Sequence, residues 1–171
     1  MTGKLEQAFR TYAASKLEQS YGRIADCLER LTEEQIWQRP GEASNSMGNL
    51  ALHLAGNLRQ WILHGVGGQP DVRVRDEEFA ARGGPDRKAL LAGLRDAVEQ
   101  ASDVIRRADL EKRIYVQNYD ITALEGIMHV LEHFSYHTGQ VAFATKALLD
   151  VDLAYYGSLN KKEKPKEESI P

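Results

Sequence analysis

The stretch MHVLEHFSYHTGQVAFATKAL, from Met128 to Leu148, decides the fold because it carries an unbroken helical pattern. At about 100° per residue, one side of a helix carries the histidines at 133 and 137 together with the apolar residues Val130, Val141, Ala144 and Leu148. The preceding letters TALE, Thr122 to Glu125, are typical of a capping box, which satisfies free backbone N–H groups at a helix start. Together these features predict a helix from Thr122 to about Leu149.

Three further stretches show apolar residues at spacings of three and four, the period of an amphipathic helix. They run from Leu5 to Leu31, from about Met47 to His64 and from about Asp86 to Ala108. Ser46 is a candidate N-cap for the second of these helices, and Gly65 begins a group of glycines that ends it. Four amphipathic helices predict an all-α protein, a four-helix bundle, and such bundles place metal and ligand sites among facing helices.

The segments between the helices differ in character. Thr32 and Gln35 predict one short capped turn, and KRIYVQNYDI, residues 112–121, alternates briefly as an extended segment does. The segment from Gly65 to Pro85 is rich in glycine, proline and charge and has no clear period. We expect it to form a long crossover between the second and third helices, to reach over one end of the molecule and to border a site.

Length and composition limit the class of protein. A chain of 171 residues with 42% hydrophobic content can bury one core. We therefore expect one domain over residues 1–150 and a charged C-terminal tail over residues 151–171, because the tail has too few apolar side chains to offset the entropy of ordering it. The net charge of −3 and the lack of a long basic block argue against nucleic acid as a partner.

The sequence also bears on location. No apolar run approaches the ~20 residues of a membrane span, and the first residues lack the apolar core of a signal peptide. The lone cysteine, Cys27, cannot form an internal disulfide and lies among helix-core residues, where a buried thiol is expected rather than a nucleophile. We expect a cytoplasmic protein that binds no membrane.

Three of the five histidines form one stripe along the last predicted helix. Residues eight apart on a helix are separated by about 12 Å, whereas zinc binds imidazole nitrogens at ~2.0–2.1 Å, so only adjacent members can share an ion. Either His129 with His133 or His133 with His137 is the candidate pair. A third ligand must come from the second helix, where His53 lies in an apolar face and His64 abuts the glycines at the helix end. We prefer His53, which gives a three-histidine site with open positions.

Two segments, LALHLAGNLRQWI (50–62) and HVLEHFSYHTGQVAFATKAL (129–148), resemble the DinB-like superfamily, and the resemblance covers roughly residues 1–150. The hallmark of that superfamily is a histidine in the second helix and, in the last helix, a histidine pair spaced by four just before Gly-Gln. The resemblance therefore selects His133 with His137 as the pair. The positions that carry the hallmark here are His53, His133, His137, Gly139 and Gln140.

The resemblance also implies a function. It implies a bundle, often a homodimer, that binds a divalent metal such as zinc, nickel or manganese. Some relatives are thiol S-transferases and isomerases that use bacillithiol or mycothiol, so a metal-dependent S-transferase acting on small electrophilic molecules, with a low-molecular-weight thiol as cosubstrate, is the implied activity. Many members have arginine before Gly-Gln, where this chain has Thr138, so no role of that side chain carries over.

Two other functions stay open. One is a metal-dependent hydrolase, with Glu125 or Glu132 as the base, although helical position places Glu132 on a solvated face. The other is a metal-stabilised binding or assembly module without catalysis. Tyr136 and Gln140 border the histidines and are candidates for holding the second nitrogen of a ligand. Asn57, one turn beyond His53, is a candidate for orienting a ligand, although we prefer an ordinary helix-surface amide for it.

The opposite side of the last predicted helix is also apolar and carries small residues that permit close approach of another helix. A helix that is apolar on two sides needs two neighbours, so this pattern predicts a homodimer. The residues on this side are Leu124, Met128, Leu131, Ser135, Gly139 and Ala142.

Overall fold

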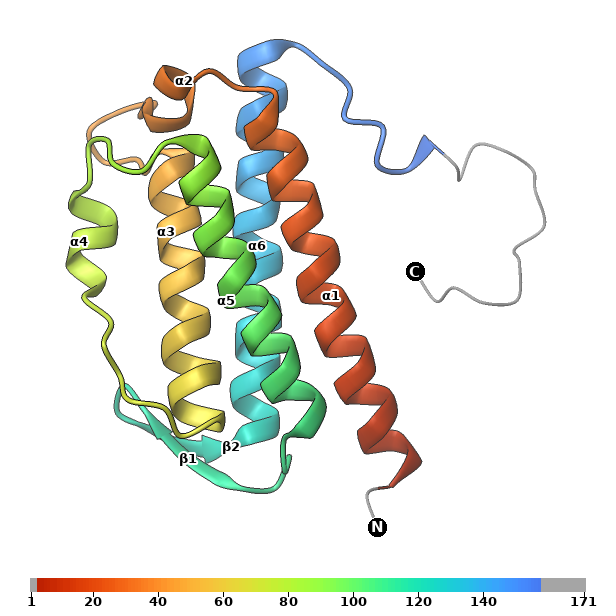
Figure 1. The fold of residues 1–171 in the computed structure, drawn as a ribbon. Coiled ribbons are helices and arrows are strands. Elements are labelled where there is room, and N and C mark those ends of the chain that lie inside the picture. The colour runs from red at the N-terminus through yellow and green to blue at the C-terminus, as the bar shows by residue number, and fades with distance from the viewer. Residues whose placement is uncertain (1–2, 158–171) are drawn as a thin grey trace.

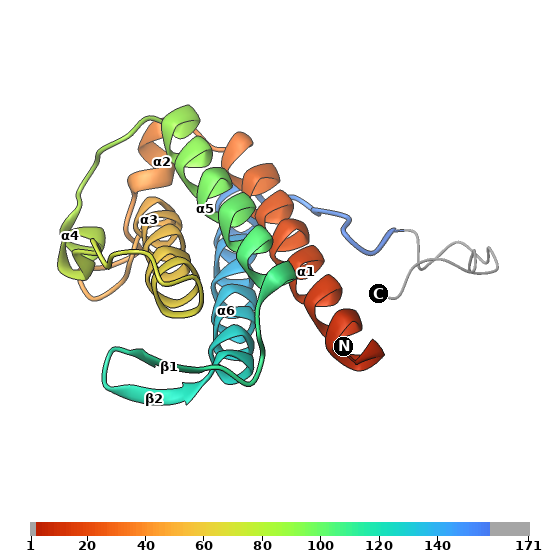
Figure 2. The same cartoon turned by 60° about the horizontal axis from the view of Figure 1, so that its bottom comes forward.

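The computed structural model describes residues 3–157, and four long helices form a bundle within them (Figure 1). These are α1 (Lys4–Glu29), α3 (Met47–Leu58), α5 (Arg87–Arg107) and α6 (Ala123–Leu149). Helices α1 and α3 each pack against both α5 and α6, and Figure 2 shows α1 and α3 on opposite sides of the bundle. The predicted all-α four-helix bundle is confirmed, with helix ends close to those expected.

Helix α3 continues directly into a π-helix, η1 (Arg59–Val66), where the sequence predicted one helix to His64. A π-helix makes wider turns than an α-helix, so the side chains of η1 rotate away from the positions that an unbroken α-helix would give them. The predicted N-cap is confirmed, because the Ser46 side chain accepts a hydrogen bond from the backbone of Asn49 and Asn49 completes the capping box.

Helices α3 and α5 run in the same direction, so the chain between them must return along the length of the bundle (Figure 1). The expectation that this crossover reaches over one end was wrong. Residues 67–86 run beside α3 and include a short helix, α4 (Arg75–Ala80), which packs against α3. Its six residues are too few to show a helical period, which is why the pattern did not predict it.

Two smaller elements agree with the sequence. The capped turn is helix α2 (Glu33–Trp37), and the extended segment is a hairpin of β1 (Arg113–Val116) and β2 (Tyr119–Thr122) paired antiparallel. Gln117 and Asn118 form its turn with positive φ angles of 53° and 88°, the backbone region that two-residue hairpin turns require. The hairpin lies at the end of the bundle where α6 begins (Figure 2).

Each bundle helix contributes fully buried side chains to one core, as its spacing predicted. Helix α3 is covered almost all round, and Leu52 is its one residue that is not buried. The thiol of Cys27 is also buried, as predicted. The largest fully buried side chains are Leu17, Ile24, Leu28, Leu31, Ile36, Leu54, Leu58, Ile62, Leu94, Ile105, Ile127 and Phe134.

The last described residues, 151–157, pack against α1. Leu153 is buried, and the Tyr155 hydroxyl lies 3.0 Å from the Arg23 carbonyl oxygen and 3.2 Å from Cys27 Sγ. The domain end at residue 150 stays a prediction, and residues 158–171 of the predicted tail lie outside the described residues. No helix within residues 3–157 combines the length and apolarity that crossing a bilayer requires.

Candidate functional site

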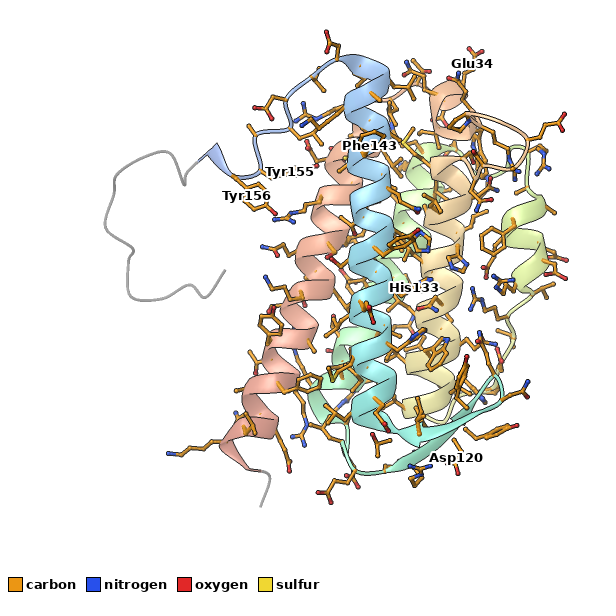
Figure 3. All side chains as sticks on the ribbon, turned by 180° about the vertical axis from the view of Figure 1, so that it is seen from behind. Glu34, Asp120, His133, Phe143, Tyr155 and Tyr156 are labelled. Atoms are coloured by element: carbon orange, nitrogen blue, oxygen red, sulfur yellow. The ribbon has the colours of Figure 1, made fainter. Side chains whose placement is uncertain are left out.

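Three histidines from two helices meet between α3 and α6. Nε2 of His133 lies 3.0 Å from Nε2 of His53 and 3.2 Å from Nε2 of His137. One ring nitrogen from each of the three lies within 4.8 Å of the other two. His133 is therefore the central member, on the side of α6 that faces α3 (Figure 3).

A divalent ion fits this set of donors. Two imidazole nitrogens on one tetrahedral zinc, each bound at ~2.0–2.1 Å, are about 3.4 Å apart, and the two short separations here are close to that value. Lone pairs this close repel each other unless a proton or a cation lies between them. Three neutral imidazoles also leave coordination positions open, which is typical of catalytic metal sites.

Burial keeps these rings neutral. Burial, followed by the proximity of His137 and His53, lowers the pKa of His133 from 6.5 to about 3. Burial also lowers the pKa of His137, although its hydrogen bond to Gln140 acts in the opposite direction. Near pH 7 these two rings therefore offer lone pairs, the form in which histidine binds a metal.

Each outer histidine has one ring nitrogen that does not approach His133, called here its outer nitrogen. In His137 this is Nδ1, and its partner lies on the same helix. Its Nδ1 donates a hydrogen bond to Oε1 of Gln140 at 2.7 Å, which leaves Nε2 with the lone pair. The contact predicted for Gln140 is thus confirmed. Tyr136, the other candidate, packs edge-on against the His137 ring instead, with centroids 5.1 Å apart and its side chain largely exposed.

The outer nitrogen of His53 is held from the crossover by two residues that no sequence pattern identified. Oε2 of Glu78 lies 3.0 Å from His53 Nδ1, and Arg73 binds both oxygens of Glu78, at 2.7 and 2.8 Å. Burial disfavours the ionised carboxylate, but Arg73 and His53 outweigh it and lower the pKa of Glu78. The one signal available was that this charge-rich segment was expected to border a site.

His129 and His64 lie outside the group. The His129 ring packs against Trp61 with centroids 4.2 Å apart and the ring planes tilted by 34°, and its centroid is 5.9 Å from that of His133. His64 Nδ1 donates to the carbonyl oxygen of Gln69 at 2.7 Å, the ordinary role expected of an isolated histidine. Of the two pairs left open by helical spacing, the structure gathers His133 with His137.

Other candidate residues have different surroundings. Asn57 is buried, so the expectation of a surface amide was wrong, because α3 is covered on nearly every side. Glu125 caps α6, where its carboxylate accepts hydrogen bonds from the backbone N–H and the hydroxyl of Thr122. Glu132 is exposed, as its helical position predicted.

A cavity of about 580 Å³ lies between α3 and the crossover. Its walls include Leu52 and Val72, together with Arg73 and Glu78. The three clustered histidines do not line it. The ion pair of Arg73 and Glu78 thus contacts both this cavity and His53.

Comparison with known proteins adds a family. The model of a family described as "Protein of unknown function (DUF1572)" matches residues 5–158, most of the chain. A search of curated protein sequences gave no significant match.

Two solved structures show a similar fold. A conserved protein from Enterococcus faecalis has a TM-score of 0.67 at 16% identity, with 82% of this chain and 97% of that chain covered. A DinB-like protein, YjoA, from Bacillus subtilis has a TM-score of 0.65 at 15% identity, with 85% and 96% covered. The fold implied by the DinB-like resemblance is thereby confirmed.

Proposed function

Because this chain belongs to the DUF1572 family and has the DinB-like fold, we propose that it binds a divalent metal through His53, His133 and His137 and transfers a thiol to small electrophilic molecules. The observation that carries the metal site is the convergence of three imidazole nitrogens, with separations of 3.0 and 3.2 Å about His133. Zinc, nickel and manganese are the candidate ions.

The surroundings of the histidines support this proposal. A divalent ion, when bound, supplies positive charge that lowers the pKa of a thiol or water at an open position. His53 and His137 direct their outer nitrogens to Glu78 and Gln140, which leaves their Nε2 atoms for the metal. The Phe79 ring, 4.6 Å from that of His53, offers an apolar surface for an organic substrate.

A thiol substrate is favoured over hydrolysis by the positions of the carboxylates. Glu125 caps α6, Glu132 is exposed, and both oxygens of Glu78 are bound by Arg73, so none of these three is a free base beside the histidines. A thiol needs less help from a base than water does, because its ordinary pKa of about 8.5 is already near neutral. The choice of bacillithiol or mycothiol as the thiol follows from the DinB-like resemblance.

An activity screen tests the proposal. Metal-free protein is reloaded with zinc, nickel or manganese and assayed with bacillithiol, mycothiol, glutathione and coenzyme A against chloro- and epoxide substrates. Metal-dependent turnover that survives in His129→Ala and is lost in His133→Ala supports the transferase. If metal raises the melting temperature and no thiol is transferred, the chain is a metal-stabilised binding module and the transferase proposal fails.

Location and assembly complete the proposal: a cytoplasmic homodimer that acts on small molecules. Support for self-association comes from large apolar side chains that α6 exposes to solvent. Met128 is 55% exposed and Phe143 is 75% exposed, and a second copy packed on this helix would remove apolar surface of both from water.

A further inference from the structure

Nδ1 of His53 lies between an acceptor and a donor. The acceptor is Oε2 of Glu78 and the donor is Nη2 of Arg73, and each is 3.0 Å away. The side chains of Arg73 and Glu78 are only 2% and 10% exposed, so water competes little for these contacts. The two groups require opposite states of Nδ1. An ionised carboxylate can only accept a hydrogen bond, so it requires Nδ1 to carry the proton, whereas a guanidinium can only donate one, so it requires Nδ1 to carry the lone pair.

The geometry of the ion pair resolves this conflict in favour of Glu78. Arg73 directs Nε and Nη2 to the two oxygens of Glu78 at 2.7 and 2.8 Å, shorter than its 3.0 Å contact with His53. The ionised carboxylate that receives these two hydrogen bonds can only accept, so the Nδ1–H group of His53 donates to Oε2 of Glu78. Nε2 of His53 then carries the lone pair, and it points at His133.

Arg73 is itself fixed by the π-helix. Its Nη1 donates to Oε1 of Gln60 at 3.0 Å, and the same oxygen accepts a hydrogen bond from Gln117 in the hairpin at 2.7 Å. The guanidinium is therefore held from η1 and the hairpin as well as from Glu78. These contacts hold the guanidinium beside both Glu78 and His53.

Gly56 makes room for the carboxylate. A Cβ atom at this position would lie 1.9 Å from Oε1 of Glu78 and 3.0 Å from Nε of Arg73. Any larger residue at position 56 would push the carboxylate away from His53. The glycine one turn after His53 is thus part of the same arrangement.

We infer that Glu78 is a positioning residue that sets the tautomer of His53, that Arg73 holds its carboxylate in place, and that Gly56 admits it. This inference rests on the proposed function, because it concerns the ligand role of His53. Its sharpest consequence concerns the Glu78→Ala variant. Removing the carboxylate leaves Arg73 as the nearest partner of Nδ1. Nδ1 then accepts a hydrogen bond from the guanidinium, so the single ring proton of neutral His53 lies on Nε2, the atom that must bind metal.

Long-range ¹H–¹⁵N spectra of the chelator-treated protein test the tautomer directly. The wild type is expected to carry the His53 proton on Nδ1, Glu78→Ala on Nε2, and Glu78→Asp on Nδ1 again. Glu77→Gln is the matched control, since the neighbouring acidic residue makes no contact with His53. A wild-type proton on Nε2, or an unchanged tautomer in Glu78→Ala, would overturn the inference.

Zinc affinity, measured by competition with a chromogenic chelator, gives the second readout. Glu78→Ala is expected to bind about 10-fold to 100-fold more weakly than wild type. The double variant Arg73→Ala/Glu78→Ala should recover part of that loss, because the opposing donor is gone as well. A double variant that binds zinc more weakly than Glu78→Ala contradicts the inference.

Gly56→Ala answers the same question if Glu78→Ala does not fold, because it keeps both charged groups and displaces the carboxylate. Gly22→Ala on α1 is its control, since a Cβ there meets nothing within 4 Å. Weakened zinc binding in Gly56→Ala alone is expected, and equal binding in both variants contradicts the inference. A wild type that binds no zinc refutes the proposed function, while the tautomer of the metal-free protein still decides the role of Glu78.

Discussion

His53 and His133 are 80 residues apart in the sequence, and their Nε2 atoms lie 3.0 Å apart between α3 and α6. Two ring nitrogens at this distance cannot both present lone pairs to each other without a proton or a cation between them. His133 makes a second such approach, to His137 at 3.2 Å. The central histidine therefore contacts both of its neighbours through the same atom.

His133→Ala is expected to weaken metal binding more than any other single histidine variant. Its affinity should fall by more than about 100-fold relative to wild type, because the loss of a residue that only hydrogen-bonds a metal ligand already costs about 10-fold to 100-fold. His129→Ala is the control on the same helix face, since its ring packs against Trp61 rather than joining the three clustered histidines. Metal analysis and zinc competition of the purified variants measure the difference. Equal losses in the two variants would show that the ion is not held where the nitrogens converge.

The part of this site on α6 could be predicted because one helix carries it. The helical period fixes the spacing of His133 and His137, and the same period placed them on the apolar side. The choice of His53 over His64 depended on the apolar face of α3, and the choice between two histidine pairs depended on the DinB-like resemblance. Local periodicity alone did not relate the two helices.

The rest of the site could not be predicted because it lies on segments without a period. Glu78 is on a helix of six residues inside the crossover, and Arg73 precedes that helix in irregular backbone. Their contact with His53 depends on the path of residues 67–86 beside α3, which no spacing in the sequence encodes. The position of Gln60 depends on a π-helix, which changes the rotation per residue that the prediction assumed.

The metal-free protein should lose stability as the pH falls from about 6.5. The folded-state pKa of His133 is about 3, whereas the unfolded chain binds the proton near pH 6.5. Between these values the unfolded state holds more protons, so the free energy of unfolding falls with pH across this window. Above pH 6.5 His133 is neutral in both states and contributes no slope. His137, with a pKa also lowered, acts in the same direction.

Urea unfolding of chelator-treated wild type and His133→Asn at several pH values measures this effect. The variant should show a shallower decline between pH 6.5 and 5, where Glu78 is still ionised in both states because its unfolded-state pKa is near 4.5. A wild type whose stability is constant over that interval would contradict the neutral state of the half-buried His133.

Breaking the pair of Arg73 and Glu78 from either side should be strongly destabilising. Removing one partner leaves a buried charge without compensation, which typically costs about 3–5 kcal/mol. Arg73→Met and Glu78→Gln are therefore each expected to unfold at much lower denaturant than wild type, while the double variant Arg73→Met/Glu78→Gln recovers most of the loss. Arg95→Met, in a pair whose side chains are both 61% exposed, is the control and should change little. Additive single effects would show that the two charges do not depend on each other.

The homodimer is tested through α6. Light scattering at micromolar concentration should give twice the mass of one chain for wild type. Phe143→Ser removes the most exposed large apolar side chain of α6 and should shift the mass toward one chain. Tyr115→Ser, which alters a 66% exposed side chain on the hairpin, is the control for a general change in surface polarity. A wild-type mass near that of one chain removes the dimer from the proposal.

The β-hairpin packs against η1 at Gly65, where the missing side chain leaves room for Val116 of β1. A Cβ atom at Gly65 would lie 2.3 Å from Cγ2 of Val116, whose short branched side chain cannot swing aside, so Gly65→Ala must displace β1 or η1. Such overpacking should cost about 1–3 kcal/mol of unfolding free energy. Gly93→Ala on α5 is the matched control, because its Cβ meets open space and alanine is the better helix former, so a gain of about 0.5–1 kcal/mol is expected. Denaturant unfolding measures the free energy of unfolding of both variants. A Gly65→Ala variant more stable than wild type would contradict the packing of Val116 against η1.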